Sequence, residues 1–264
     1  MQAALTLPST DVSRFPTDAD LRGYDRAQSF AKMIAAAIAA RVEIGMSERD
    51  ATRVTYEVFA ENGVRDHWHM PVIGVGEGST KFASAGRFLW HLFGGSKRIV
   101  KNGDILFIDI APMFEGYPSD FTLTHLYGEN ARLAKMIDTA CSLTRRVSRH
   151  LREDMRGGDA WAWIKAEIEA ACPYELRQFP ISPVGHRFSK LPAHWPIFWE
   201  IGTIHLLTMG DPLLLPSSKT SMRGLWVLEP LLVDRDLDRA AKTEEIVFVT
   251  GSETMIFGEA PFAS

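Results

Sequence analysis

The chain has 264 residues, of which 46% are hydrophobic and 23% charged, and its formal net charge at pH 7 is −4. This is an ordinary globular composition, with enough chain to bury the core of one large domain or two small ones. The weak negative charge gives no reason to expect a nucleic acid or an anionic membrane as partner. No stretch approaches the roughly 18 uninterrupted apolar residues that would cross a bilayer.

The cysteine count and the N-terminal segment indicate the compartment. Cys141 and Cys172 are the only two cysteines, which is too few for a disulfide framework and suits a reducing environment. The opening segment MQAALTLPSTDVSRFPTD lacks the basic region and the long apolar run of a secretory signal. We therefore expect a cytoplasmic protein.

The chain alternates between helical and strand-like regions. Alanine-rich and amphipathic stretches predict helices, and Ser47 with Asp50 has the spacing of a capping box at the start of one of them. Runs of β-branched and aromatic residues predict strands. The expected elements, in chain order, are an irregular arm at 1–19, helices at 20–41 and 46–63, a β region at 70–127, helices at 131–153 and 158–171, and strands at 225–233, 244–250 and 253–257.

This order predicts the fold class. Two helices followed by a sheet occur twice along the chain, which indicates an α+β protein with two similar halves that share one sheet. Regular alternation of strands and helices is absent, and a doubly wound parallel fold is therefore disfavoured. We expect residues 20–264 to form a single domain.

An acidic hairpin stands out within the β region. The segment GDILFIDIAPMFEGYPSDFTLT, residues 103–124, reads as two strands joined by a tight turn, with Asp109 in the first strand and Asp120 in the second. If Phe114-Glu115 form the turn, the two aspartates are directly opposite each other; if Glu115-Gly116 form it, they are diagonal neighbours. Both registers place the carboxylates on the same face.

Two carboxylates on one buried face repel each other unless a proton or a cation lies between them. No lysine or arginine occurs between residues 102 and 131, so a local salt bridge is not available. A metal ion is the simple remedy, and such ligands suit Mn, Co, Zn, Fe or Mg. The alternative is a pair of surface aspartates on a solvated sheet face.

Three further residues are candidates for the same chemistry. His186 follows a glycine after a proline-rich stretch, and Glu229 stands alone within the apolar run LWVLEPLLV, where an unpaired carboxylate is costly. Glu253 follows the turn of the last hairpin, and Glu244 and Glu245 compete with it for any role. Each has an ordinary alternative: a structural or exposed histidine, an edge-facing glutamate next to a proline, or an exposed turn glutamate.

Taken together, these segments resemble the pita-bread metallohydrolase family, which includes methionine aminopeptidase, proline-specific aminopeptidase (aminopeptidase P), prolidase and creatinase. The family hairpin NGDxxxxDxxxxxxGYxxDxTRT is matched by NGDILFIDIAPMFEGYPSDFTLT, and a Gly-His dipeptide is matched by Gly185-His186. The strand ending in Glu-Pro is matched by Glu229-Pro230, and the last hairpin by VFVTGSETMIF. The resemblance covers roughly residues 20–258 and implies the pita-bread fold, with two pseudo-symmetric halves around a curved, mainly antiparallel sheet.

The resemblance also implies a site. It implies two divalent metal ions (Mn, Co, Zn or Fe), a metal-bridging water as nucleophile, and a homodimer, which base rates also favour. Glu229 would relay protons between the nucleophile and the leaving amine, and two histidines would bind substrate. The implied metal ligands are Asp109, Asp120, His186, Glu229 and Glu253, and the implied catalytic residues are Glu229, His194 and His91.

The sequence departs from the family pattern at several points. Thr122-Leu123 stands where proline-specific members have Thr-Arg, and Arg187-Phe188 replaces a glycine-rich continuation after Gly-His. The leading expectation is an aminopeptidase or dipeptidase that acts on short peptides, with Xaa-Pro peptides as one option. The alternatives are a creatinase-like hydrolase of a small non-peptide C–N substrate and a non-catalytic pita-bread binding module.

Overall fold

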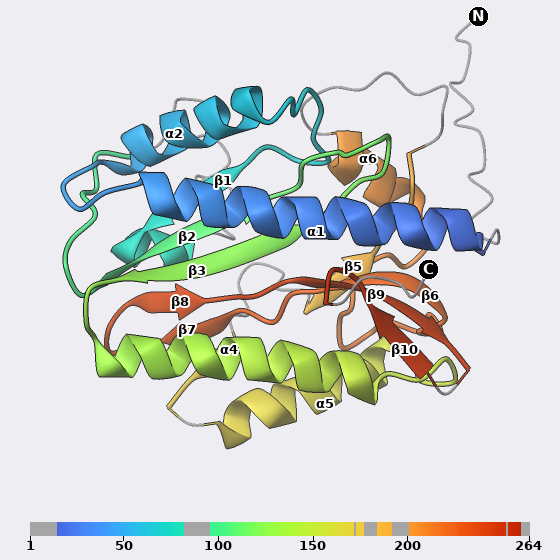
Figure 1. Cartoon of the computed structure of the whole chain (residues 1–264). Coiled ribbons are helices and arrows are strands. Elements are labelled where there is room, and N and C mark those ends of the chain that lie inside the picture. The colour runs from blue at the N-terminus through green and yellow to red at the C-terminus, as the bar shows by residue number, and fades with distance from the viewer. Residues whose placement is uncertain are drawn as a thin grey trace, which may run out of the picture.

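The computed structural model of this chain describes residues 15–81, 96–171, 173–176, 184–191, 201–251 and 253–259. Figure 1 shows a layer of strands with one pair of long helices on each side of it. The expected order of two helices followed by strands, repeated once, is confirmed. The helices are α1 (Asp18–Arg41), α2 (Glu48–Glu61), the short η1 (Gly76–Lys81), α4 (Ala131–His150), α5 (Gly157–Ala170) and α6 (Ile201–Thr208).

The first two helices both begin at a capping box. The side chain of Ser47 accepts a hydrogen bond from the amide of Asp50 at 3.1 Å, and the Asp50 carboxylate accepts one from the amide of Ser47 at 2.9 Å. Thr17 and Asp20 make the same reciprocal pair at the start of α1. Each box satisfies backbone donors that a first helical turn leaves free. The predicted capping box of α2 is confirmed, and α1 begins two residues earlier than expected.

The described strands form three antiparallel sheets instead of the one shared sheet that the sequence predicted. The first sheet has the order β1 (Val72–Val75), β2 (Asp104–Ile110), β3 (Phe121–Tyr127). The second has the order β10 (Glu253–Ile256), β9 (Glu245–Thr250), β6 (Gly224–Leu228), β5 (Gly185–Arg187). The third has the order β4 (Glu175–Leu176), β7 (Leu232–Asp234), β8 (Arg239–Ala241).

The expected strand at 225–233 is divided at Glu229-Pro230. β6 ends at Leu228 and pairs with β5 and β9, whereas β7 begins at Leu232 and pairs with β4 and β8. Proline has no amide hydrogen to give to a ladder, which favours a break at this point. The break leaves Glu229 at the end of a buried strand, outside the regular ladder.

The acidic hairpin adopts one of its two predicted registers. Asp109 lies opposite Thr122, and Phe114 and Tyr117 exchange two backbone hydrogen bonds of 2.9 Å across the turn. The turn residues Glu115 and Gly116 have φ angles of 51° and 77°, as a type I′ turn requires. The two aspartates are therefore diagonal neighbours.

Each helix pair packs its own apolar core against the strands. One core joins α1 and α2 to β1 and β2, and the other joins α4 and α5 to β6 and β9. No helix among the described residues is both long enough and apolar enough to cross a membrane.

Candidate metal centre

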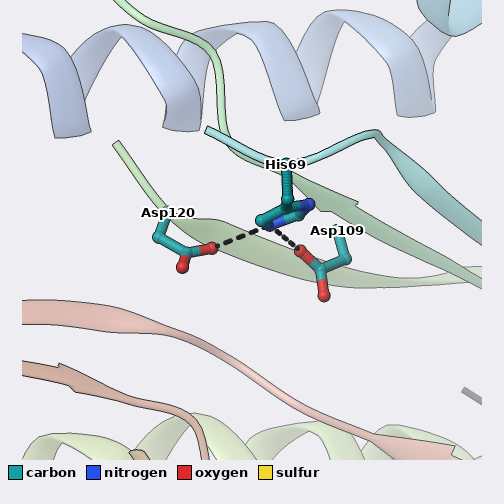
Figure 2. A group of neighbouring side chains, drawn as sticks. All are labelled: His69, Asp109 and Asp120. Atoms are coloured by element: carbon teal, nitrogen blue, oxygen red, sulfur yellow. Dashed lines mark hydrogen bonds and ion pairs between the residues drawn. The ribbon is translucent and has the colours of Figure 1, made fainter. Parts of the chain in front are cut away.

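His69, Asp109 and Asp120 form a compact group in the interior of the strand layer. Figure 2 shows the imidazole of His69 between the two carboxylates, and its Nε2 lies 3.3 Å from Asp109 Oδ1 and 3.3 Å from Asp120 Oδ1. Both aspartates are buried. The ligand atoms of all three residues lie within 4.8 Å of one another, which suits a single ion. The hairpin carboxylates thus face a shared centre, and the alternative of a solvated sheet face does not apply.

His186 and Glu229 extend this group from the second sheet. His186 lies on β5, and its Nε2 lies 3.3 Å from Asp120 Oδ2 and 3.9 Å from Glu229 Oε1. The amide of Glu229 donates to the carbonyl of Val184 at 2.9 Å, which ties the end of β6 to the start of β5. Four of the five residues predicted as metal ligands are therefore linked by contacts in one cluster.

The two histidines are held in the same orientation. Nδ1 of His69 lies 2.7 Å from the carbonyl oxygen of Met70, and Nδ1 of His186 lies 2.8 Å from that of Arg187. A carbonyl can only accept, so Nδ1 carries the proton and donates in both cases. In the neutral tautomer the lone pair then lies on Nε2, the atom that faces the carboxylates, as in a metal-ligating histidine.

Lys242 and Glu244 complete the cluster. The sequence left Glu244 as a competitor of Glu253 for a ligand role and gave Lys242 no role. The Lys242 ammonium lies 3.2 Å from Asp109 Oδ2 and 2.8 Å from Glu229 Oε2, and it also donates to Glu244 Oε1. Its side chain is 1% exposed and that of Glu244 is 2% exposed. The hairpin carboxylates do have a cationic partner, but it is 133 residues from Asp109 along the chain.

The structure does not bring Glu253 to this cluster. Glu253 is exposed at the start of β10, where it pairs with Thr250 at the tip of the last hairpin. Glu244 precedes β9 and lies about 20 Å away along the strand, at roughly 3.3 Å per residue. Of the two competing glutamates, Glu245 instead pairs with Lys32 at 2.7 Å. His91 and His194, the predicted substrate-binding histidines, lie outside the described residues.

The charges of the cluster act strongly on one another. Burial would lower the pKa of His69, but Asp109 and Asp120 outweigh it and raise that pKa well above its usual value. Burial likewise opposes the raised pKa of His186, which Asp120 and Glu229 produce. The pKa of Asp120 is lowered, because His186 and His69 outweigh the effect of its burial.

Glu244 behaves in the opposite way. Burial, reinforced by the negative charges of Asp109 and Asp120, raises its pKa well above the usual range, although Lys242 opposes this shift. Its second oxygen, Oε2, is buried with no hydrogen-bond partner among the described residues. A buried carboxylate oxygen without a donor is costly and marks a position where a cation would be stabilised.

Two features outside the cluster position its ligands. The Gln28 amide on α1 donates to the backbone carbonyl of Asp120 at 2.8 Å and accepts from the backbone amide of Asp120 at 3.2 Å. Gly185 allows a close approach of β5 to β6, since an added Cβ would lie 2.3 Å from the carbonyl oxygen of Val227. The glycine of the Gly-His dipeptide is therefore required by packing.

The donor set fits a divalent metal ion. It combines imidazole nitrogens with carboxylate oxygens, a mixture that Zn, Mn, Fe and Co accept. The neutral tautomer of each histidine would direct a lone pair to the centre, and Glu244 has an oxygen without a partner. His69 was missed because an isolated histidine before a strand carries no local signal. Pairing with the hairpin brings that segment to the centre: Val72 lies opposite Asp109, and the amide of Trp68 donates to the carbonyl of Ala111 at 2.8 Å.

Comparison with known proteins identifies the family. The family model described as metallopeptidase family M24 matches residues 22–210, a range that includes His69, Asp109, Asp120 and His186. No curated protein matches the sequence. Among solved structures, an Xaa-Pro dipeptidase from Bacillus anthracis has 17% identity and a TM-score of 0.71, with coverage of 94% of this chain and 63% of that one.

Two further structures have the same fold. A prolidase from Pyrococcus furiosus has 16% identity and a TM-score of 0.70, with coverage of 93% of this chain and 65% of that one. A methionine aminopeptidase from Thermotoga maritima has 16% identity and a TM-score of 0.66, with coverage of 94% of this chain and 99% of that one. The chain thus spans less than two thirds of the proline-specific enzymes. Because the family model matches well over half of its length, the chain belongs to metallopeptidase family M24, a family of metal-dependent hydrolases.

Proposed function

We propose that this chain is a metal-dependent hydrolase that cleaves short peptides, as an aminopeptidase or a dipeptidase. The observation that carries the proposal is the buried cluster in which His69 and His186 direct Nε2 at the carboxylates of Asp109 and Asp120. The named activities of the structural neighbours, which include Xaa-Pro dipeptidase, prolidase and methionine aminopeptidase, support peptides as the substrate class.

The residues that would hold the metal differ in part from those predicted. Glu244 replaces Glu253, since Glu244 is buried in contact with Lys242 and Glu253 is exposed. His69 is added because its Nε2 lies 3.3 Å from both hairpin aspartates. The proposed centre therefore comprises His69, Asp109, Asp120, His186, Glu229 and Glu244. When bound, a divalent ion would activate a water as nucleophile and polarise the scissile carbonyl.

Glu229 is the proposed proton carrier. Its side chain is 15% exposed, compared with 2 to 3% for Asp109, Asp120 and Glu244, so it has the most access to substrate among these carboxylates. It lies at the end of β6, beside His186 and Lys242. A carboxylate in this position can take a proton from the nucleophile and give it to the leaving amine.

The identity of the metal, the oligomeric state and the cellular location stay predictions. Mn, Co, Zn and Fe are all compatible with the donor set, and cellular availability selects among them. A homodimer and a cytoplasmic location remain as the sequence predicted them. The number of ions depends on Lys242.

The proposal is tested by metal content and peptide cleavage of wild type, Asp120→Asn and Asp138→Asn. Asp138 is exposed on α4 and serves as the matched control. We expect wild type and Asp138→Asn to bind metal and to cleave Xaa-Pro or Met-Xaa peptides. Asp120→Asn should lose both by at least about tenfold, since it removes a charge that the centre needs.

The possible results separate the three functions considered from the sequence. Bound metal without cleavage of any peptide would point to a hydrolase of a small non-peptide substrate. No metal in the wild type, even after reconstitution with Mn²⁺ or Co²⁺, would contradict the proposal and leave a binding module.

A further inference from the structure

The buried ammonium of Lys242 lies within the cluster itself. Lys242 lies between β8 and β9, and two hydrogen bonds hold its backbone to β3. The Lys242 amide donates to Thr124 Oγ1 at 3.1 Å, and Thr124 Oγ1 donates to the Lys242 carbonyl at 3.0 Å. The ring of Phe107 on β2 lies beneath the ammonium, with Nζ 5.8 Å from the ring centroid. The position of Lys242 is therefore fixed by the fold and is not a chance rotamer at the surface.

The ammonium takes the contacts that a metal ion would take. Its three hydrogens match three carboxylates, those of Asp109, Glu229 and Glu244. These are three of the four carboxylates of the proposed centre, and they come from β2, from the end of β6 and from the segment before β9. A lysine in this geometry satisfies one oxygen of each of three carboxylates that would otherwise hold a cation.

The two carboxylate oxygens of Asp109 face two different partners. Oδ1 faces His69 Nε2 at 3.3 Å, whereas Oδ2 faces Lys242 Nζ at 3.2 Å. The group of His69, Asp109 Oδ1 and Asp120 is free of the lysine and keeps the spacing of a single ion. On the other side of Asp109, a divalent ion would have to share oxygens with a fixed positive charge, which like-charge repulsion disfavours.

We infer that Lys242 takes the place of one metal ion, so that this chain holds one divalent ion and not two. The ion would lie at His69, Asp109 and Asp120, next to His186, and Lys242 would neutralise Glu229 and Glu244. This inference rests on the proposed function, because it assumes that the cluster binds metal. The sequence predicted two ions, whereas here one ion would be bound and Lys242 would take the place of the other.

The inference is tested by counting metal in the full chain. Wild type, Lys242→Gln and Lys32→Gln are reconstituted with Mn²⁺, desalted and measured by elemental analysis against protein concentration. Lys32 is the matched control, since it pairs with Glu245 at 2.7 Å and does not contact the cluster. We expect one Mn²⁺ per chain in wild type and in Lys32→Gln, and two in Lys242→Gln.

A second measurement does not depend on the variant being folded. Electron paramagnetic resonance of the Mn²⁺-loaded wild type should give the signal of an isolated ion, without the exchange coupling that two ions a few ångströms apart produce. Two ions per chain in the wild type, or a coupled signal, would overturn the inference while leaving the proposed function intact. No bound ion in the wild type would overturn both.

Discussion

At the scale of single residues, protons and a metal ion compete for the same ligand atoms of the cluster. The raised pKa values of His69 and His186 mean that these imidazoles keep their protons to a higher pH than usual in the metal-free protein. A metal ion needs the same Nε2 lone pairs, and so it must displace those protons. The protons of the metal-free state thus occupy the places that the ion fills.

Metal affinity should therefore rise with pH. The two histidine pKa values lie above the usual 6.5, so each imidazole releases its proton at a higher pH than an ordinary histidine does. Each displaced proton weakens apparent binding by about tenfold per pH unit below its pKa. Calorimetric titration with Mn²⁺ at pH 6.5 and pH 8 should show tighter binding at pH 8, with proton release that appears as a dependence on buffer enthalpy.

Two histidine variants, one in the cluster and one control, test whether the cluster histidines cause the pH dependence of metal affinity. His69→Gln should flatten the pH dependence by removing one displaced proton. His150→Gln should leave it unchanged, because His150 is stacked on Trp163 at 4.0 Å and is exposed, away from the cluster. An affinity that is the same at both pH values would show that the histidines do not bind the ion.

At the scale of elements, the site depends on where strands end and how closely they approach. The type I′ turn at Glu115-Gly116 sets the diagonal register of Asp109 and Asp120. The break at Pro230 frees Glu229 from the ladder, and the absence of a side chain at Gly185 allows β5 to lie against β6. Small backbone features thus decide whether the carboxylates and imidazoles meet.

Gly185→Ala should disturb the site without removing any ligand. The new Cβ would lie 2.3 Å from Val227 O, so β5 must move and His186 moves with it. We expect the free energy of unfolding to fall by about 1–3 kcal/mol and the Mn²⁺ affinity by about 10- to 100-fold. Urea unfolding and metal titration measure the two effects.

Gly210→Ala is the matched control, since nothing lies within 4 Å of its added Cβ. It should leave stability and affinity unchanged. Normal metal affinity in Gly185→Ala would mean that the strands tolerate the added methyl group and that His186 is not held by this contact.

At the scale of the whole molecule, the cluster joins parts that fold against separate cores. Asp109 lies in the sheet that packs on α1 and α2, and Asp120 directly precedes one of its strands. His186 and Glu229 lie on or beside the sheet whose strands pack on α4 and α5. An ion shared by these ligands binds the folded chain and not the unfolded one, in which the ligands are far apart. Metal should thus add to global stability.

The melting temperature should rise on metal loading. Free Mn²⁺ at 100 times its Kd contributes about 2.7 kcal/mol, which corresponds to roughly 5–10 °C for a chain of this size. Thermal melts in Mn²⁺ and in EDTA measure the difference, and Asp120→Asn should show little of it. Equal melting temperatures for the wild type in both conditions would contradict a metal that links the two sheets.

The local features of the chain follow from local patterns. Ser47 and Asp50 predict a helix start because a capping box needs only residues three apart. Asp109 and Asp120 share a face because side chains in a hairpin alternate with a period of two and a tight turn fixes the register. The long helices and the acidic hairpin with Asp109 and Asp120 could for these reasons be predicted without a structure. The assignment of His186 and Glu229 to the same centre came instead from the resemblance to a known family.

The rest of the centre depends on packing between distant segments. Lys242 reaches Asp109 across 133 residues, and His69 reaches Asp120 across 51, so no local period relates them. Glu244 and Glu253 look alike as isolated acidic residues, and only the pairing of β9 with β6 and β10 makes one buried and the other exposed. Turns and periodicities are set by neighbouring residues, whereas the burial and pairing of charges are set by which surfaces the folded chain brings together.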